Sequence, residues 1–213
     1  MFAPCLLLFI LGSINADEAP LHCDFDHTLC GWWNDENAGA KWTNHLNVKG
    51  IFANIVHGRN MARLISPIYD HGLVEDGCFY LDCGFYISDI AFRVYQVPVS
   101  LGVTGLLTST EEIKRKYIIH EAERVNVTSI STVYLYPVSM FHPGYTENFQ
   151  IVIEASCEKG IIFINEVEIF RGRKCIEAAN ASVTPPPGTT QTYYTNRNNN
   201  LQTVTTSPNT TTT

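Results

Sequence analysis

The sequence predicts an all-β fold: an antiparallel, jelly-roll-like β-sandwich with room for one short helix, followed by a disordered C-terminal tail. Three observations support this prediction. Apolar residues alternate with a period of two, turn residues separate the short apolar runs, and the composition changes sharply after Cys175. Many short strands with turns between them are typical of sandwiches and jelly rolls.

Residues 1–16 are expected to form a signal peptide. The segment from Phe2 to Leu11 is almost entirely apolar, and small residues follow it up to Ala16. The segment is too short to span a bilayer, which takes about 20 apolar residues. No later stretch is long and apolar enough, so we expect an exported, extracellular chain without membrane insertion. The alternative is a buried N-terminal strand or helix.

The folded domain is expected over residues 17–177, and its strands follow from the alternation. Turn residues separate the strands at 70–72, 75–77, 143–144 and 158–160. The residues that share the apolar side of their runs are Phe79, Leu81, Cys83, Phe85 and Ile87; Ile90, Phe92 and Val94; Val133 and Leu135; and Phe149, Ile151, Ile153, Ala155 and Cys157.

One segment favours a helix. Ser109 and Glu112 have capping-box spacing, and Glu111–Arg115 and Glu112–Lys116 are spaced as i,i+4 ion pairs. We therefore expect a short helix near residues 110–116, packed on the sandwich.

Residues 178–213 are expected to be a disordered stalk or tail rich in Thr, Pro and Asn. They contain few large apolar side chains, so they cannot bury enough surface to offset an ordering cost of about 1–2 kcal/mol per residue. Thr with Pro also suits an O-glycosylated stalk. The chain ends within a Thr run, which is compatible with a longer protein.

The charge of the chain excludes some partners. The formal net charge is −7, and residues 1–16 contribute nothing to it. A mildly acidic chain is a poor ligand for nucleic acid and for anionic membranes.

Cysteine usage agrees with export. Of seven cysteines, Cys5 leaves with the signal peptide, and the six that remain suggest three disulfides. Cys23 and Cys30 are close enough for a local bond. Cys83 and Cys157 each fall on the apolar side of a strand, so we expect them to bond across the core; the alternative is two free buried thiols. That assignment leaves Cys78 for Cys175.

Several segments resemble the MAM domain family, the extracellular module of meprin, neuropilin and mu-type receptor tyrosine phosphatases. The opening residues 23–32 followed by Trp42, the strand of residues 62–67, and Cys78 before an aromatic strand all resemble that family. So do residues 149–154 and the ending from Gly160 to Cys175. The resemblance covers about residues 21–176.

The resemblance implies a jelly-roll-like sandwich with disulfides Cys23–Cys30 and Cys78–Cys175, and it makes Cys83–Cys157 an addition. It also implies non-catalytic adhesion. Two departures matter: a conserved family segment is missing between Trp42 and Ala62, and Asn165–Glu166 replaces the acidic pair of the ending. Some members bind a cation through such acidic positions, and because the acidic pair is replaced here, we assign neither a metal nor a cofactor.

No catalytic constellation is visible in the sequence. The histidines lack metal-ligand spacing, and Asp24 with Asp26 is a carboxylate pair without a recognisable cleft. We therefore do not expect an enzyme. Three Asn-x-Ser/Thr sequons predict glycosylation at Asn126, Asn180 and Asn209.

The leading hypothesis is an extracellular recognition or adhesion module that contacts another protein or itself. The alternatives are a secreted lectin-like jelly roll that binds carbohydrate or another ligand, and a non-catalytic appendage of an extracellular enzyme. Trp32 and Trp33 are consecutive, so on a strand they cannot both point inward. An exposed Trp33 beside Asn34 and Asp35 would favour the lectin-like alternative.

Overall fold

The computed structural model describes residues 19–45, 48–56, 61–86, 90–123, 132–135, 137–181, 193–194 and 203–204. The expected signal peptide and the sequons at Asn126 and Asn209 lie outside these residues. In the described part, no helix is long and apolar enough to cross a membrane.

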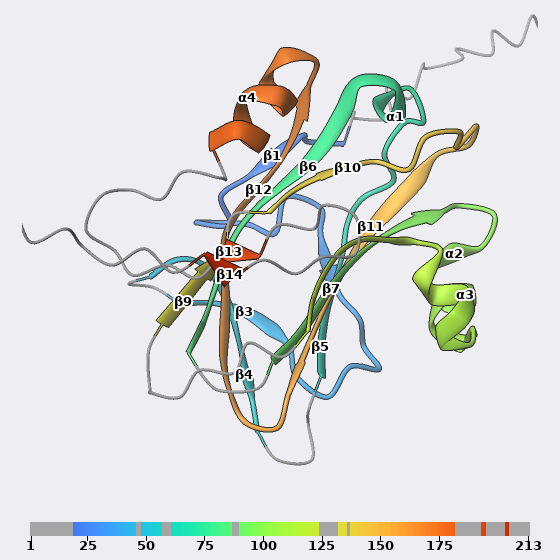
Figure 1. The fold of residues 1–213 in the computed structure, drawn as a ribbon. Helices are drawn as coiled ribbons and strands as arrows, with labels where there is room; N and C mark the ends of the chain where they lie inside the picture. The colour runs from blue at the N-terminus through green and yellow to red at the C-terminus, as the bar shows by residue number, and fades with distance from the viewer. Residues whose placement is uncertain are drawn as a thin grey trace, which may run out of the picture.

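The fold is an antiparallel, jelly-roll-like sandwich of two sheets, as the sequence predicts (Figure 1). The seven-stranded sheet has the order β10-β6-β12-β4-β3, with β1 paired to β12 and β9 paired to β6. Its strands are β1 (His22–Cys23), β3 (Trp42–His45), β4 (Val48–Ile55), β6 (Gly77–Tyr86), β9 (Thr132–Leu135), β10 (Val138–Met140) and β12 (Gly160–Arg171).

The second sheet is five-stranded, in the order β2-β5-β11-β7-β8. Its strands are β2 (Trp33–Asn34), β5 (Met61–Ile65), β7 (Ile90–Pro98), β8 (Ile118–Glu123) and β11 (Phe149–Cys157). A separate short pair joins β13 (Tyr193–Tyr194) to β14 (Thr203–Val204), inside the segment expected to be a disordered tail.

The core lies between the two sheets and confirms the predicted alternation. Phe79, Leu81, Cys83 and Phe85 of β6 are all buried in it, whereas Tyr86 is exposed. From the other sheet, Phe92 of β7 meets the Phe85 ring edge-on at 5.6 Å between centroids. Such aromatic pairs add directional contacts to the burial of apolar area.

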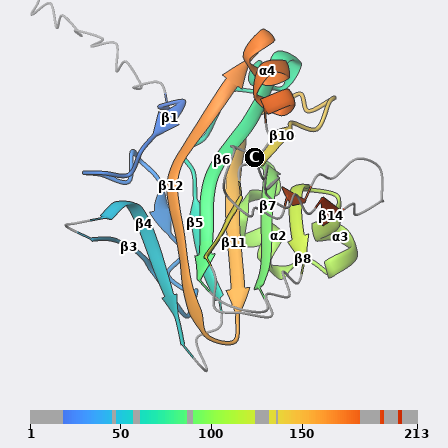
Figure 2. The same ribbon diagram turned by 60° about the vertical axis from the view of Figure 1, so that its left-hand side comes forward.

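The five-stranded sheet is also covered on part of its outer face. Helices α2 (Gly102–Thr108) and α3 (Glu111–Arg115) lie beside β7 and β8, away from β3 and β4 (Figure 2). Leu106 of α2 packs with Ile65, Tyr95, Val97 and Val152 in a second, smaller apolar cluster. For this reason β11 is buried on both faces along most of its length, whereas its alternation predicts a half-buried strand.

The structure contains more helix than the single one predicted. Helix α3 matches the expected helix near residues 110–116, but the expected capping box does not form, because the Ser109 hydroxyl donates to the Gly105 carbonyl at 2.7 Å instead. Glu111 bonds Lys114 and Arg93, not the expected Arg115. Two further helices are α1 (Leu73–Asp76) and α4 (Arg173–Ala181), and α4 runs past the domain boundary expected at residue 177.

Candidate functional site

The candidate site lies on the outer face of the five-stranded sheet and begins at Trp33. Trp33 is 43% exposed, whereas Trp32 and Trp42 are 3% and 2% exposed. This confirms the prediction that only one of the two consecutive tryptophans can point inward. Trp33 pairs with Ile65, which belongs to the outer apolar cluster, so its side chain stands at the edge of the outer face.

The neighbours of Trp33 hold it in place. The Asn34 side chain bonds the backbone of Trp42 twice: its Oδ1 accepts from the Trp42 N–H at 2.7 Å, and its Nδ2 donates to the carbonyl at 3.0 Å. Asp35 is buried and accepts from the Asn37 N–H at 3.0 Å and from Arg63 Nη1 at 2.9 Å. The lectin-like alternative would use Asn34 and Asp35 beside the exposed Trp33, but in the structure their side chains bond protein groups and position the strand.

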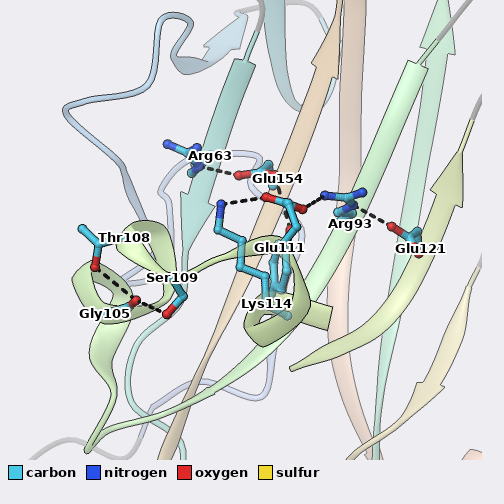
Figure 3. A network of polar contacts seen from close by, with 10 residues as sticks. Arg63, Arg93, Gly105, Thr108, Ser109, Glu111, Lys114, Glu121 and Glu154 are labelled. Atoms are coloured by element: carbon cyan, nitrogen blue, oxygen red, sulfur yellow. Dashed lines mark hydrogen bonds and ion pairs between the residues drawn. The ribbon is translucent and has the colours of Figure 1, made fainter. Parts of the chain in front are cut away.

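Charged side chains continue across this face from strand to strand. Arg63 of β5 bonds Asp35, and its Nε donates to Glu154 Oε2 of β11 at 2.6 Å. Farther along, Arg93 Nε of β7 donates to Glu121 Oε1 of β8 at 2.6 Å (Figure 3). We name Asp35, Arg63, Glu154, Arg93, Glu121 and Glu111 the charged row.

Helix α3 is fastened to the charged row. Arg93 Nη1 donates to Glu111 Oε2 at 3.0 Å, and Lys114 Nζ donates to the other Glu111 oxygen at 3.0 Å (Figure 3). The Lys114 hydrogen bond is the main reason that the pKa of Glu111 lies below its usual value. Glu111 therefore stays ionised at neutral pH and links the helix to the sheet.

The end of the charged row that contains Asp35, Arg63 and Glu154 is the more buried one. The Arg63, Asp35 and Glu154 side chains are 15%, 7% and 12% exposed. Burial alone would raise the pKa of Asp35, but the Asn37 N–H and Arg63 outweigh it and lower the pKa. Buried charges of this kind need partners, and each has one here. Among the described residues, Arg63 donates from Nε and from one N–H of Nη1, and these two bonds leave its other N–H groups unused.

A second exposed patch lies on the outer face of the other sheet. Tyr86, Ile161 and Val56 are 48%, 40% and 41% exposed, and Ile161 of β12 pairs directly with Tyr86 of β6. Nearby, Phe163 lies across Gly84, where a Cβ would come within 2.2 Å of the ring. This patch is apolar and carries no charged row, so it differs in chemistry from the Trp33 face.

Two of the three expected disulfides are present. Cys23–Cys30 and Cys78–Cys175 are bonded, with Cα atoms 5.9 and 5.8 Å apart. The third expected bond does not form: Cys83 and Cys157 are free, buried thiols. Both side chains face the core, as predicted. The alternation of a strand fixes only the side of the sheet on which a residue lies, and not whether two cysteines come close enough to bond. Cys83 lies opposite Ile164 within its sheet, whereas Cys157 is the last residue of β11 and lies opposite Ile90.

The acidic positions form no metal centre in the described part of the chain, where no group of three or more His, Cys, Asp or Glu side chains could hold an ion. Asn165 Nδ2 donates to Asp82 Oδ1 at 3.2 Å, at a bulge in β12. Asp24 Oδ1 accepts from the Asp26 N–H at 3.1 Å, as in a turn. The sequon residue Asn180 is exposed in the last turn of α4.

Comparisons with known proteins leave the family open. No family model and no curated protein matches the chain, so the resemblance to MAM domains stays a prediction. Among solved structures, a module specific for non-crystalline cellulose (CBM28) is 10% identical, with a TM-score of 0.45 over 72% of this chain and 94% of that one.

Other solved structures lie at a similar distance. A mannan-recognising module (TmCBM27) is 14% identical, with a TM-score of 0.44 over 70% of this chain and 95% of that one. A sialidase is 10% identical, with a TM-score of 0.43 over 76% of this chain and 19% of that one. At this level the likenesses carry no argument about a ligand, so the function has to be argued from the residues.

Proposed function

We propose that the chain is a non-catalytic extracellular recognition module that binds carbohydrate on the outer face of its five-stranded sheet. The observation that carries the proposal is the exposed Trp33 indole at the end of a fixed row of charged side chains. Two disulfides suit the oxidising conditions outside the cell.

The chemistry of the face suits a sugar ring. A pyranose has a flat apolar C–H side, which can lie on an indole, and a rim of hydroxyl groups. Beside the indole, Arg63 offers the N–H groups that its bonds to Asp35 and Glu154 do not use. Because these groups already bond one another, little side-chain entropy is lost on binding.

A glycan array probed with the secreted chain tests this proposal. Trp33→Ala should abolish or weaken the signal at every spot that binds the wild type, because the stacking surface is gone. Tyr86→Ala is the matched control, since Tyr86 is equally exposed but lies on the other sheet. An array without any wild-type signal, or equal loss in both variants, would count against the carbohydrate proposal.

The apolar patch supports a second candidate function, contact with a protein or with a second copy of the chain. Contiguous exposed apolar side chains such as Tyr86, Ile161 and Val56 are typical of protein interfaces. Sedimentation velocity over a concentration series, with calcium and then with chelator, tests self-association. Dimers that Ile161→Lys disperses would favour this function, and a monomer at every concentration would argue against self-association.

A further inference from the structure

A buried histidine lies inside the sandwich on its edge strand. His120 of β8 is 7% exposed, and its Nε2 has no hydrogen-bond partner in the described structure. It pairs with Val94 of β7, and its ring meets the Phe92 ring at a steep angle, with 6.5 Å between the centroids. An imidazole in such surroundings is stable only when it is neutral.

No charge in the described surroundings compensates a protonated His120. On the same face of β7 the residues are Phe92, Val94 and Gln96, and Gln96 is a buried amide. From β10, which lies against β8, Ser139 is the buried polar residue. From β6, burial raises the pKa of the Cys83 thiol well above its usual value, so that group stays neutral.

The charged residues of the two strands lie elsewhere. Arg93 and Glu121 pair with each other on the opposite, outer face. His142, in the turn after β10, contacts the same face: its backbone N–H donates to Gln96 Oε1 at 2.7 Å, and its Nε2 is buried without a partner in the described structure. An imidazole carries no negative charge, so His142 cannot offset a positive charge on His120.

We propose that His120 makes the edge strand β8 acid-sensitive: its protonation loosens β8 and releases the Glu121 end of the charged row. An edge strand has a neighbour on one side only, and among the described strands that neighbour is β7. Local opening of β8 is therefore the easiest way for His120 to reach water and take up a proton. The device does not depend on what the module binds.

The direction of the pH effect follows from the burial of His120. Burial lowers the pKa of His120 to about 4 in the folded chain, whereas an unfolded histidine has a pKa near 6.5. The stabilising effect of the neutral form is therefore complete above pH 6.5 and is lost as the pH falls from 6.5 toward 4. At pH 4.5 the opening equilibrium of β8 should be about 60-fold more favourable than at pH 7.

Hydrogen exchange of β8 peptides at pH 7 and pH 4.5, corrected for intrinsic exchange rates, tests the proposal. Wild-type β8 should lose about 60-fold in protection, while β6 and β12 keep theirs. His120→Leu should remove the pH effect in β8. His120→Gln serves as a second variant because Gln is neutral and polar, so it separates the loss of the titrating ring from the gain of an apolar side chain. His27→Gln, which changes an exposed histidine, should behave as the wild type.

Three results would overturn the proposal. In the first, β8 protection does not change with pH. In the second, both His120 variants lose protection by the wild-type factor. In the third, all core strands lose protection together, which would show global unfolding in place of a local device.

Discussion

Arg63 is the residue on which the buried end of the charged row depends, because it bonds both Asp35 and Glu154. Arg63→Met should cost about 3–5 kcal/mol, since it leaves two carboxylates poorly solvated and unpaired. Urea unfolding measures the change. Arg171→Met is the matched control: Arg171 bonds Asp76 at 2.9 Å, but both side chains are about half exposed, so the loss should stay within about 1 kcal/mol. Equal losses would show that the row is not a buried network.

Cys83 and Cys157 provide a second test at the residue scale. Burial raises the pKa of both thiols, to about 11 for Cys157, so little thiolate is present at pH 8. Both should resist alkylation in the native chain and react fully in denaturant without reductant, as read by peptide mass spectrometry. A Cys83–Cys157 disulfide peptide would contradict the free thiols of the structure.

Sequence patterns predicted part of what these individual residues do. The consecutive tryptophans required one exposed indole, and parity placed both thiols in the core. Parity could not predict the free state of the thiols, because it says nothing of position along the strand. The sequence also could not predict that Arg63 pairs with Asp35 and Glu154, because these partners lie 28 and 91 residues away from Arg63 in the chain.

At the scale of elements, Gly50 of β4 fits the bulge in β12. It has a φ of +84°, and a Cβ there would lie 2.1 Å from the Ile164 carbonyl oxygen. Gly50→Ala should cost about 3 kcal/mol or more, because positive-φ strain adds to a clash with backbone. Gly144→Ala isolates the strain, since Gly144 has a φ of +91° with nothing within 4 Å, and should cost about 1 kcal/mol. Thermal or urea unfolding measures the difference between the two losses of stability. Similar losses would mean that the backbone of β12 moves aside at little cost.

The strands could be predicted because their alternation is visible within a short stretch of sequence. Much of the helix content could not be predicted in this way. Helix α2 contains two glycines, one valine and two threonines, which give little helix signal. It forms because Leu106 covers the outer face of the sheet, a tertiary contact. The same contact explains why β11 is buried on both faces.

At the scale of the whole molecule, the two disulfides close loops of very different length. The bonded residues are 7 apart for Cys23–Cys30 and 97 apart for Cys78–Cys175. In the chain-entropy model, removing the pair Cys78 and Cys175 by serine should cost about 5 kcal/mol, against about 2 kcal/mol for Cys23 and Cys30. Denaturant unfolding of the two double variants measures the order, and a reversed order would mean that local strain outweighs loop entropy.

The proposed function places the ligand on the Trp33 face of the sandwich and not on the Tyr86 face. The most direct test is backbone amide chemical-shift mapping with the tightest ligand from the glycan array. We predict shifts grouped at Trp33, Arg63 and Glu154, all from the five-stranded sheet, and their loss in Trp33→Ala. Shifts grouped at Tyr86 and Ile161 would contradict the claim and move the site to the seven-stranded sheet.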